Sequence, residues 1–520
     1  PFIKPIKAKL MNSSKIKRYV GLIESSNVYD VAQITPVTKA NQLSKLLKNE
    51  VLLKREDLQP IFSFKIRGAY NKLSKLKLKG IQGPFIAASA GNHAQGVAFG
   101  AKSLGLKAYI VMPITTPSIK VNSVKNYGGK VILYGDNFDE AFQHAKFLAK
   151  EEGYTFIHPY DDKDVIAGQG TVGKELIEQV DSKIDAIFVP VGGGGLLAGL
   201  GTYVKYVSPK TKIIGVEPED AACLKLALDN NKRLSLPEVG LFADGVAVKQ
   251  IGKETFSLIR DWIDDVVTIT VDEMCASVQD TFQETRTISE PAGALALAGL
   301  KKYSLSRGLK NKTLVAINSG SNLNFDRLGH IVERVQFGES KEALLSVKIP
   351  EEKGSFRKFC NYLGKRSISE FNYRAEESEE ANIFVACRFN DKEGKLKLIK
   401  HLKSKGFSPR DLSENEVAKL HIKHMVGGRA PKEVFSKGEY IFRVQFPERP
   451  GALIDFLDKL SDKFNITLFH YRNQGAAYGR VLVGFESKEK NYPKLLKYLS
   501  NTGFRFWDET QNSAYKSFLK

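Results

Sequence analysis

The sequence has few cysteines and no long apolar run, and each shortage excludes a class of protein. Among its 520 residues there are four cysteines, none of them paired as CxxC: Cys223, Cys275, Cys360 and Cys387. This number is too small for a disulfide framework, so we predict a reducing compartment and no metal site. The apolar stretches are short and interrupted by charge, which predicts that no helix spans a membrane.

The N-terminal segment 1–18 is basic but lacks the apolar centre of a signal peptide. Because the chain starts at Pro1 and not at methionine, we expect an N-terminus that has been processed or trimmed. We predict a cytoplasmic protein, or a protein of a plastid or another organelle if the source is eukaryotic.

Basic residues outnumber acidic ones, which raises the question of a polyanionic partner. The chain has 78 lysines and arginines and 58 aspartates and glutamates, which gives a formal net charge of +20. They are spread along predicted helices, as in 73–79 and 395–405, and no nucleic-acid-binding motif accompanies them. We predict neither a nucleic-acid nor a membrane partner, and a basic nucleic-acid-binding protein stays open as the non-enzymatic alternative.

The pattern of apolar residues changes near residue 337. From 31 to 324, short apolar runs alternate with longer amphipathic stretches, which predicts an α/β unit with a largely parallel sheet. The predicted strands are 51–54, 85–88, 108–111, 130–134, 186–191, 213–217 and 313–317. Ligands of such sheets bind beyond the carboxyl ends of the strands. Beyond 337 there is an internal repeat, in which 345–354 is echoed by 442–451. The order of predicted elements in each copy is typical of a small α+β sandwich.

Two polar features of the α/β part are candidates for chemistry. Lys65 lies between Phe64 and apolar residues, and a desolvated lysine amine is nucleophilic enough for Schiff-base chemistry. Ser89 to His93 follow the predicted strand 85–88, where the free N–H groups of a helix N-terminus can hold a carboxylate. Taken singly, each has a plainer explanation, because most lysines are solvated and most strand-to-helix turns are structural.

A third feature is the run of four glycines, Gly192–Gly195, after the predicted strand 186–191. Such a run costs conformational entropy, and its backbone N–H groups can close around a phosphate. It also fits a dinucleotide fingerprint, Gly193-x-Gly195-x-x-Ala198, with Glu217 as the ribose-binding acid. A nicotinamide-dependent oxidoreductase therefore stays open on this motif.

The fourth feature is Ser319, after the predicted strand 313–317, where a hydroxyl can hydrogen-bond a heteroaromatic nitrogen. Without the other three features, a polar loop would be the plainer explanation.

The four features, in this order, resemble the fold type II pyridoxal-phosphate enzymes of the tryptophan-synthase-β type. More narrowly, the chain resembles the biosynthetic threonine ammonia-lyase (threonine dehydratase) family, from Lys54-Arg-Glu-Asp57 through Ser289-Glu290-Pro to both copies of the repeat. Catabolic threonine dehydratases and serine racemases share the front part but lack this double tail.

The resemblance implies an α/β, two-lobed, tryptophan-synthase-β-like catalytic unit, followed by two α+β ACT-like sandwiches. It implies these boundaries: a tail at 1–20, a catalytic domain at 21–336 with the smaller lobe inserted at about 65–165, ACT-like domains at 337–413 and 438–512 joined by a helix and linker at 414–437, and a tail at 513–520.

The resemblance also implies pyridoxal 5'-phosphate as the cofactor, no metal, and a role for each residue. Lys65 would carry the cofactor covalently and act as the base, with Phe64 beside it, while Asn92 would hydrogen-bond the ring hydroxyl. Ser319 would face the pyridine nitrogen. The phosphate would be held by the backbone N–H groups of Gly192, Gly193, Gly194, Gly195 and Leu196. The substrate carboxylate would be received by Ser89, Ala90, Gly91, Asn92 and His93.

The implied reaction is β-elimination of L-threonine, and also of L-serine, with threonine giving 2-oxobutanoate and ammonia in the first step of isoleucine biosynthesis. A neutral Ser319 cannot stabilise a pyridinium as a carboxylate would, which favours elimination over transamination. The tail implies feedback inhibition by isoleucine, opposed by valine, and a homotetramer. We predict that Tyr373 and Tyr471, at equivalent positions of the two copies, contact the effector. A serine dehydratase or racemase with the same front part is the alternative within the resemblance.

Overall fold

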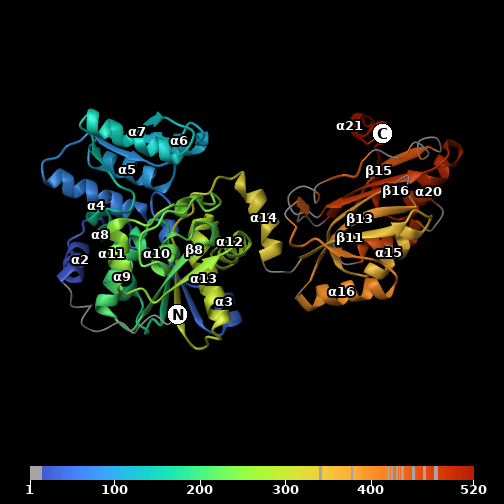
Figure 1. The fold of residues 1–520 in the computed structure, drawn as a ribbon. Helices are drawn as coiled ribbons and strands as arrows, with labels where there is room; N and C mark the ends of the chain where they lie inside the picture. Colours follow the sequence, from blue (N-terminus) through green and yellow to red (C-terminus); the bar gives the residue numbers. More distant parts are fainter. Residues whose placement is uncertain are drawn as a thin grey trace. The chain divides into compact units, whose positions relative to one another are not determined.

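The structure is a computed structural model with two compact units, Pro1–Gly338 and Glu339–Lys520 (Figure 1). Each unit is described by itself. The residues that the structure describes are 14–338, 342–375, 379–389, 392–415, 417–418, 422, 425–428, 431, 434, 438–447, 451–460, 464–472 and 478–519. In these ranges, no helix is both long enough and apolar enough to cross a membrane.

The larger sheet of the first unit has six strands, and all but its first strand run parallel. Their order is β1 (Val37–Lys39), β2 (Glu50–Arg55), β10 (Thr313–Asn318), β7 (Ala186–Pro190), β8 (Lys212–Pro218) and β9 (Asp265–Ile269). Both faces are apolar, since Leu52 and Val51, neighbours in β2, belong to cores on opposite faces. Parallel sheets of this kind need helices on both faces.

The helices on the two faces come from different parts of the chain. One core contains side chains of α2 (Ser14–Glu24), α8 (Lys163–Gln179), α9 (Gly195–Val207), α10 (Cys223–Asp229) and α11 (Lys253–Ile259). The opposite core contains side chains of α3 (Asn41–Leu47), α12 (Val271–Thr285) and α13 (Pro291–Ser306). Helix α14 (Arg327–Gly338) ends the unit.

The smaller sheet is four-stranded and parallel, in the order β5 (Lys130–Leu133), β4 (Ala108–Met112), β3 (Phe85–Ala88) and β6 (Thr155–Phe156). Helices α4 (Lys65–Leu78), α5 (Asn92–Ser103) and α6 (Ser118–Asn126) share one core with it, and α7 (Phe138–Glu151) packs on the other face. Figure 1 shows α5, α6 and α7 together in blue and cyan at one end of the unit. Short one-turn helices are η1 (Glu56–Leu58), η2 (Glu219–Ala221) and η3 (Asp244–Val246).

In the second unit, both copies of the repeat contribute to a single eight-stranded antiparallel sheet. The first copy comprises β11 (Glu342–Pro350), α15 (Ser355–Leu363), β12 (Ser367–Arg374), β13 (Glu380–Arg388), α16 (Lys392–Ser404) and β14 (Arg410–Asp411). The second comprises β15 (Glu439–Pro447), α19 (Ala452–Leu460), β16 (Asn465–Arg472), β17 (Tyr478–Glu486), η6 (Glu489–Asn491), α20 (Tyr492–Asn501) and β18 (Arg505–Asp508). The copies join where β12 pairs with β16.

The predicted fold class is confirmed, and the repeat is visible even in its irregularities. The register of the sheet shifts after Ile368 in β12 and after Ile466 in β16, at equivalent positions. The predicted tails differ from the structure, since α2 begins at Ser14 and α21 (Ser513–Phe518) is helical. Both are held by apolar contacts, of Tyr19 in the first unit and of Tyr515 in the second. Much of the predicted linker 414–437 lies outside the described residues.

Candidate active site

The chain turns into α4 at Lys65, directly beside the loop that follows β10. Ser63 forms an isolated bridge with Gly320, and the Phe64 N–H donates to the carbonyl of Ser319 at 3.2 Å. Two features that are about 250 residues apart in the sequence are therefore adjacent, at the carboxyl end of the sheet where ligands of such folds bind.

The amine of Lys65 is half-buried, and its Nζ donates to the carbonyl of Pro159 at 2.9 Å. The Phe64 ring lies beside it, with its centroid 5.4 Å from Nζ. Burial lowers the pKa of Lys65 to about 8, although the negative charge of Glu290 acts in the opposite direction. About a tenth of the amine is thus neutral and nucleophilic at pH 7, far more than for a solvated lysine.

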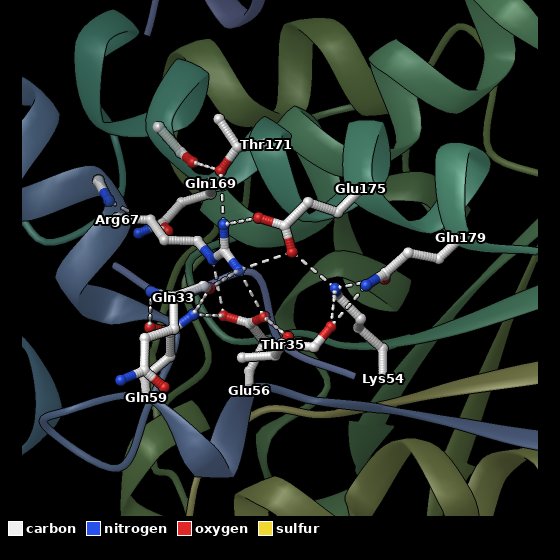
Figure 2. Close-up of polar contacts among 12 residues, drawn as sticks. Gln33, Thr35, Lys54, Glu56, Gln59, Arg67, Gln169, Thr171, Glu175 and Gln179 are labelled. Atoms are coloured by element: carbon white, nitrogen blue, oxygen red, sulfur yellow. Dashed lines mark hydrogen bonds and ion pairs between the residues drawn. The ribbon is translucent and has the colours of Figure 1, made fainter. Parts of the chain in front are cut away.

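A buried network of charges anchors the first turn of α4 (Figure 2). The guanidinium of Arg67, two residues beyond Lys65, donates to Glu56 at 2.7 and 2.8 Å and also to Glu175 in α8. Burial alone would raise the pKa of Glu56, but Arg67 outweighs burial and holds it below the ordinary value. The helix that begins with Lys65 is therefore tied both to the end of β2 and to α8.

Lys54 in β2 balances the charge of this network. Its Nζ donates to Glu175 at 2.6 Å, to the Gln179 amide oxygen at 2.8 Å and to the Thr35 carbonyl at 2.7 Å. Two cations and two carboxylates thus form a neutral set whose side chains are at most 1% exposed. Buried charges of this kind are tolerated because each has a partner and hydrogen bonds.

The glycine loop between β7 and α9 has two carbonyl groups engaged by neighbouring elements. The carbonyl of Gly193 accepts from the Thr255 hydroxyl at 2.8 Å, and that of Gly192 from the Cys223 thiol at 3.4 Å. In a trans peptide the next N–H points away from the carbonyl, so the N–H groups of Gly193 and Gly194 each point away from these partners. With the N-terminus of α9, which begins at Gly195, they form a site suited to a phosphate.

Packing is a second reason for the glycines. A Cβ on Gly193 would lie 2.2 Å from the Tyr160 ring, and one on Gly192 would lie 2.9 Å from Cα of Val246. Gly194 has φ +88°, a conformation that L side chains rarely adopt. Tyr160 follows Pro159, whose carbonyl accepts from Lys65, so the lysine and the glycine loop are also neighbours.

Asn92 is the first residue of α5 and is buried. Its Oδ1 accepts from Nδ2 of Asn322 at 2.6 Å, and its Nδ2 donates to Glu290 at 2.7 Å. Among the residues that the structure describes, the second Nδ2 proton of Asn92 has no acceptor. This proton is available to an oxygen of a bound group, as the predicted contact with a ring hydroxyl requires.

The predicted carboxylate loop lies at the end of β3. Ser89, Ala90 and Gly91 are half-buried, and the Gly91 N–H faces the Ser89 hydroxyl at 3.2 Å. His93 is turned elsewhere, with Nε2 3.0 Å from the Ile157 carbonyl. Burial lowers its pKa to about 3, so the ring is neutral and holds the backbone. What His93 can present to a substrate is its backbone N–H.

Ser319 is 3% exposed, and its hydroxyl donates to the carbonyl of Ala292 in a long 3.3 Å hydrogen bond. A weak bond of this length leaves the hydroxyl free to turn toward a better partner, such as a ring nitrogen.

Together these groups fit pyridoxal phosphate. The site holds a depressed-pKa amine for an aldehyde, backbone N–H groups for a phosphate, an unpaired amide proton for a hydroxyl and a neutral hydroxyl for a nitrogen. Within the part of the chain that the structure describes, no group of three potential metal ligands occurs.

The sequence interpretation left out two residues of the site, Glu290 and Tyr160. Glu290 stands before Pro291 at the start of α13, where a negative charge is favoured by the helix dipole. It makes no capping hydrogen bond in the structure, and its carboxylate contacts Asn92 instead. No pattern in the sequence distinguishes these two uses of an acid.

The acid proposed for a ribose in the dinucleotide alternative is already engaged. Glu217 is fully buried and accepts from the N–H groups of Leu224 at 2.7 Å and Lys225 at 2.9 Å. Its carboxylate therefore holds the start of α10, which argues against the nicotinamide-dependent alternative.

Tyr373 and Tyr471, the predicted effector contacts, lie at the seam of the two copies. Both are buried, and each pairs across the seam with a phenylalanine of the other copy, Phe469 and Phe371 respectively. The Tyr373 hydroxyl donates to Glu351 at 2.8 Å. Their role in effector binding stays a prediction.

Known proteins match both units. The family described as "Pyridoxal-phosphate dependent enzyme" matches residues 28–320, and the "C-terminal regulatory domain of Threonine dehydratase" matches 333–422 and 431–519. The L-threonine dehydratase biosynthetic IlvA of Burkholderia multivorans is 47% identical over 504 residues, covering 96% of this chain and 99% of that protein. The Escherichia coli protein of the same name is 48% identical over 502 residues, covering 96% and 97%.

A solved structure, the processed form of threonine deaminase isoform 2 from Solanum lycopersicum, aligns with a TM-score of 0.62 and 45% identity, covering 64% of this chain and 97% of that one. Together with the four converging features, these similarities favour the lyase over the oxidoreductase and over a nucleic-acid-binding protein. The chain belongs to the biosynthetic threonine dehydratase family of pyridoxal-phosphate-dependent enzymes.

Proposed function

We propose that this protein is a threonine ammonia-lyase, which converts L-threonine to 2-oxobutanoate and ammonia, with L-serine as a second substrate. The observation that carries the proposal is the convergence of Lys65, Asn92, the glycine loop and Ser319 on one site, in a chain similar to threonine dehydratases over nearly its whole length.

The proposed roles follow from the geometry. Pyridoxal phosphate, when bound, supplies an electron sink for the substrate α-carbon. Lys65 holds it and, once freed by the substrate amine, moves the α-proton, because burial lowers the pKa of this amine toward neutral pH. The glycine loop holds the phosphate, Asn92 the ring hydroxyl, and Ser319 the ring nitrogen without adding charge. Ser89 to His93 offer N–H groups to the substrate carboxylate.

The first test is a product analysis of the purified protein loaded with pyridoxal phosphate. With L-threonine we expect 2-oxobutanoate and ammonia in equal amounts, because elimination and hydrolysis release one of each. The same protein is then given L-serine. Formation of D-serine as the main product would favour the racemase alternative, and hydride transfer to a nicotinamide would favour the oxidoreductase.

The second unit is proposed to be the regulatory part, inhibited by isoleucine and relieved by valine. Allosteric coupling requires different effector affinities in two states, and couplings in proteins typically change affinity by about 5–150-fold. We expect near-millimolar isoleucine to weaken the apparent affinity for threonine within that range and valine to restore it, in initial-rate assays. Rates that do not respond to isoleucine would leave this unit without a regulatory role.

A matched pair of variants tests the predicted contacts. Tyr373→Phe and Tyr471→Phe remove only a hydroxyl and keep the buried ring at the seam. If the tyrosines contact the effector, the isoleucine response weakens while the rate without isoleucine is retained.

The predicted homotetramer and the predicted cytoplasmic or organellar location also stay proposals. Light scattering would measure the oligomeric state, and cell fractionation would determine the location.

A further inference from the structure

Glu290 is a buried carboxylate in the candidate active site to which none of the proposed roles applies. It is 4% exposed, and its backbone N–H donates to the Gly320 carbonyl at 3.2 Å, next to Ser319. Its Oε1 accepts from Nδ2 of Asn92 at 2.7 Å. The carboxylate is therefore joined both to the loop of Ser319 and to the residue proposed to bind the ring hydroxyl.

A chain of hydrogen bonds sets the direction of the Asn92 amide. The carbonyl of Ile61 can only accept, so the atom of Asn322 that faces it at 2.8 Å is Nδ2. The same Nδ2 lies 2.6 Å from Asn92, which must present its oxygen there. Nδ2 of Asn92 then faces Glu290 and keeps one proton for another acceptor. A carboxylate at Glu290 accepts a hydrogen bond and does not donate one, so it holds the Asn92 amide in this orientation.

The charged groups that act on Glu290 are Asp244 and Lys120. Burial, and then the nearby Asp244, raise the pKa of Glu290 to about 7, while the Asn92 hydrogen bond, Lys120 and the Asn322 backbone N–H lower it. Lys120 forms an ion pair with Asp244, so these two largely offset each other. Glu290 is the acid whose charge raises the pKa of the Lys65 amine against the effect of burial.

We infer that Glu290 is a positioning residue of the cofactor site, which orients the Asn92 amide toward the cofactor ring hydroxyl. This inference rests on the proposed role of Asn92. It assigns one function to this carboxylate, a hydrogen bond, and two substitutions test it.

The experiment follows pyridoxal phosphate uptake, by absorbance, in the full-length chain freed of cofactor. Condensation of the Lys65 amine with the aldehyde, with loss of one water, needs the neutral amine, so the wild-type rate should rise with pH with a midpoint near pH 8. Glu290→Gln keeps an oxygen that can accept from Asn92. Because the hydrogen bond is retained, we expect a cofactor dissociation constant close to that of the wild type.

Glu290→Asp keeps the carboxylate, but its side chain is one methylene shorter and no longer reaches Asn92. We expect a midpoint near that of the wild type and a cofactor dissociation constant raised about tenfold, since a hydrogen bond to a charged group is lost. Glu217→Gln is the matched control, because this carboxyl is also buried with a pKa raised to about 7, but its hydrogen bonds go to α10. It should leave both the midpoint and the dissociation constant unchanged.

The outcomes separate the two proposals. If the wild type takes up no pyridoxal phosphate at Lys65, the proposed function itself is wrong. If the wild type does but folded Glu290→Asp keeps the wild-type dissociation constant, the positioning role is overturned. Should Glu290→Asp not fold, Glu290→Gln decides, and a dissociation constant raised about tenfold although the oxygen for Asn92 is kept would overturn the positioning role.

Discussion

Replacing Lys65 with alanine is expected to abolish both the visible absorbance of bound pyridoxal phosphate and the release of 2-oxobutanoate from L-threonine. The variant loses the amine that would hold the cofactor and the base that would move the α-proton. Loss of a general base alone typically costs about 10²–10⁴-fold in rate, and loss of the covalent nucleophile adds to it. Absorbance spectra and a 2-oxoacid assay on the loaded protein measure both effects.

The fold should survive this substitution. Since burial lowers the pKa of Lys65 below its unfolded value, the charged amine destabilises the folded chain at neutral pH, and its removal is not expected to lower the free energy of unfolding. Lys72→Ala, on the same helix, is the control and should keep the absorbance, because Lys72 pairs with Asp162 and Asp164 away from the site. Threonine-dependent release that persists in Lys65→Ala would contradict the assignment.

Replacing Arg67 with methionine is expected to destabilise the catalytic unit by about 3–5 kcal/mol, the usual cost of removing one partner from a buried ion pair. Glu56 and Glu175 would then share only Lys54, in a region that is almost completely buried. Because the network anchors the first turn of α4, we also expect weaker cofactor binding at Lys65. Denaturant unfolding of the full chain and cofactor titration measure these two losses.

Arg260→Met is the matched control, since Arg260 pairs with Asp261 at 3.6 Å with both side chains over 40% exposed. Such pairs contribute at most about 1 kcal/mol.

The pH dependence of stability gives a second check on the role of Arg67. The pKa of Glu56 in the folded chain is below its ordinary value. Ionised Glu56 therefore stabilises the folded state above the ordinary pKa of a glutamate, and this stabilisation is lost as the pH falls through the lowered pKa. The stability difference between wild type and Arg67→Met should therefore narrow as the pH falls. A difference independent of pH, or one as small as that of Arg260→Met, would contradict the role given to Arg67.

Much of the fold could be predicted because buried parallel strands are continuous apolar runs. The predicted strands 85–88, 186–191 and 313–317 coincide with β3, β7 and β10 to within one residue. The strands that the sequence interpretation missed, β1, β6 and β9, are edge strands, and none of their residues except Ile269 is fully buried. Edge strands bury less apolar surface, so the periodicity that marks a strand is weak there.

The site was predictable mainly where a residue stands next to a strand end or forms a distinctive run. Asn92, the glycine loop and Ser319 meet this condition, whereas Lys65 was singled out by its aromatic and apolar neighbours, and the structure brings all four together. Glu290 and Arg67 do not meet it, because their importance comes from partners more than a hundred residues away. An acid before a proline and an arginine within a helix have the same sequence pattern whether they are solvated or buried against a charge.

The sequence by itself determined the fold class, the repeat, the family and the positions of the loops that carry the chemistry, since these depend on local periodicity and on short runs of residues. Only the tertiary structure decided that the two repeats share one sheet through β12 and β16, that His93 and Glu217 are engaged on backbone groups, and that Glu290 contacts Asn92. Strand pairing and buried hydrogen bonds depend on residues that are distant in the sequence and become neighbours only in the folded chain. A buried donor or charge needs a partner in place of water, and the local sequence does not show which residue supplies it.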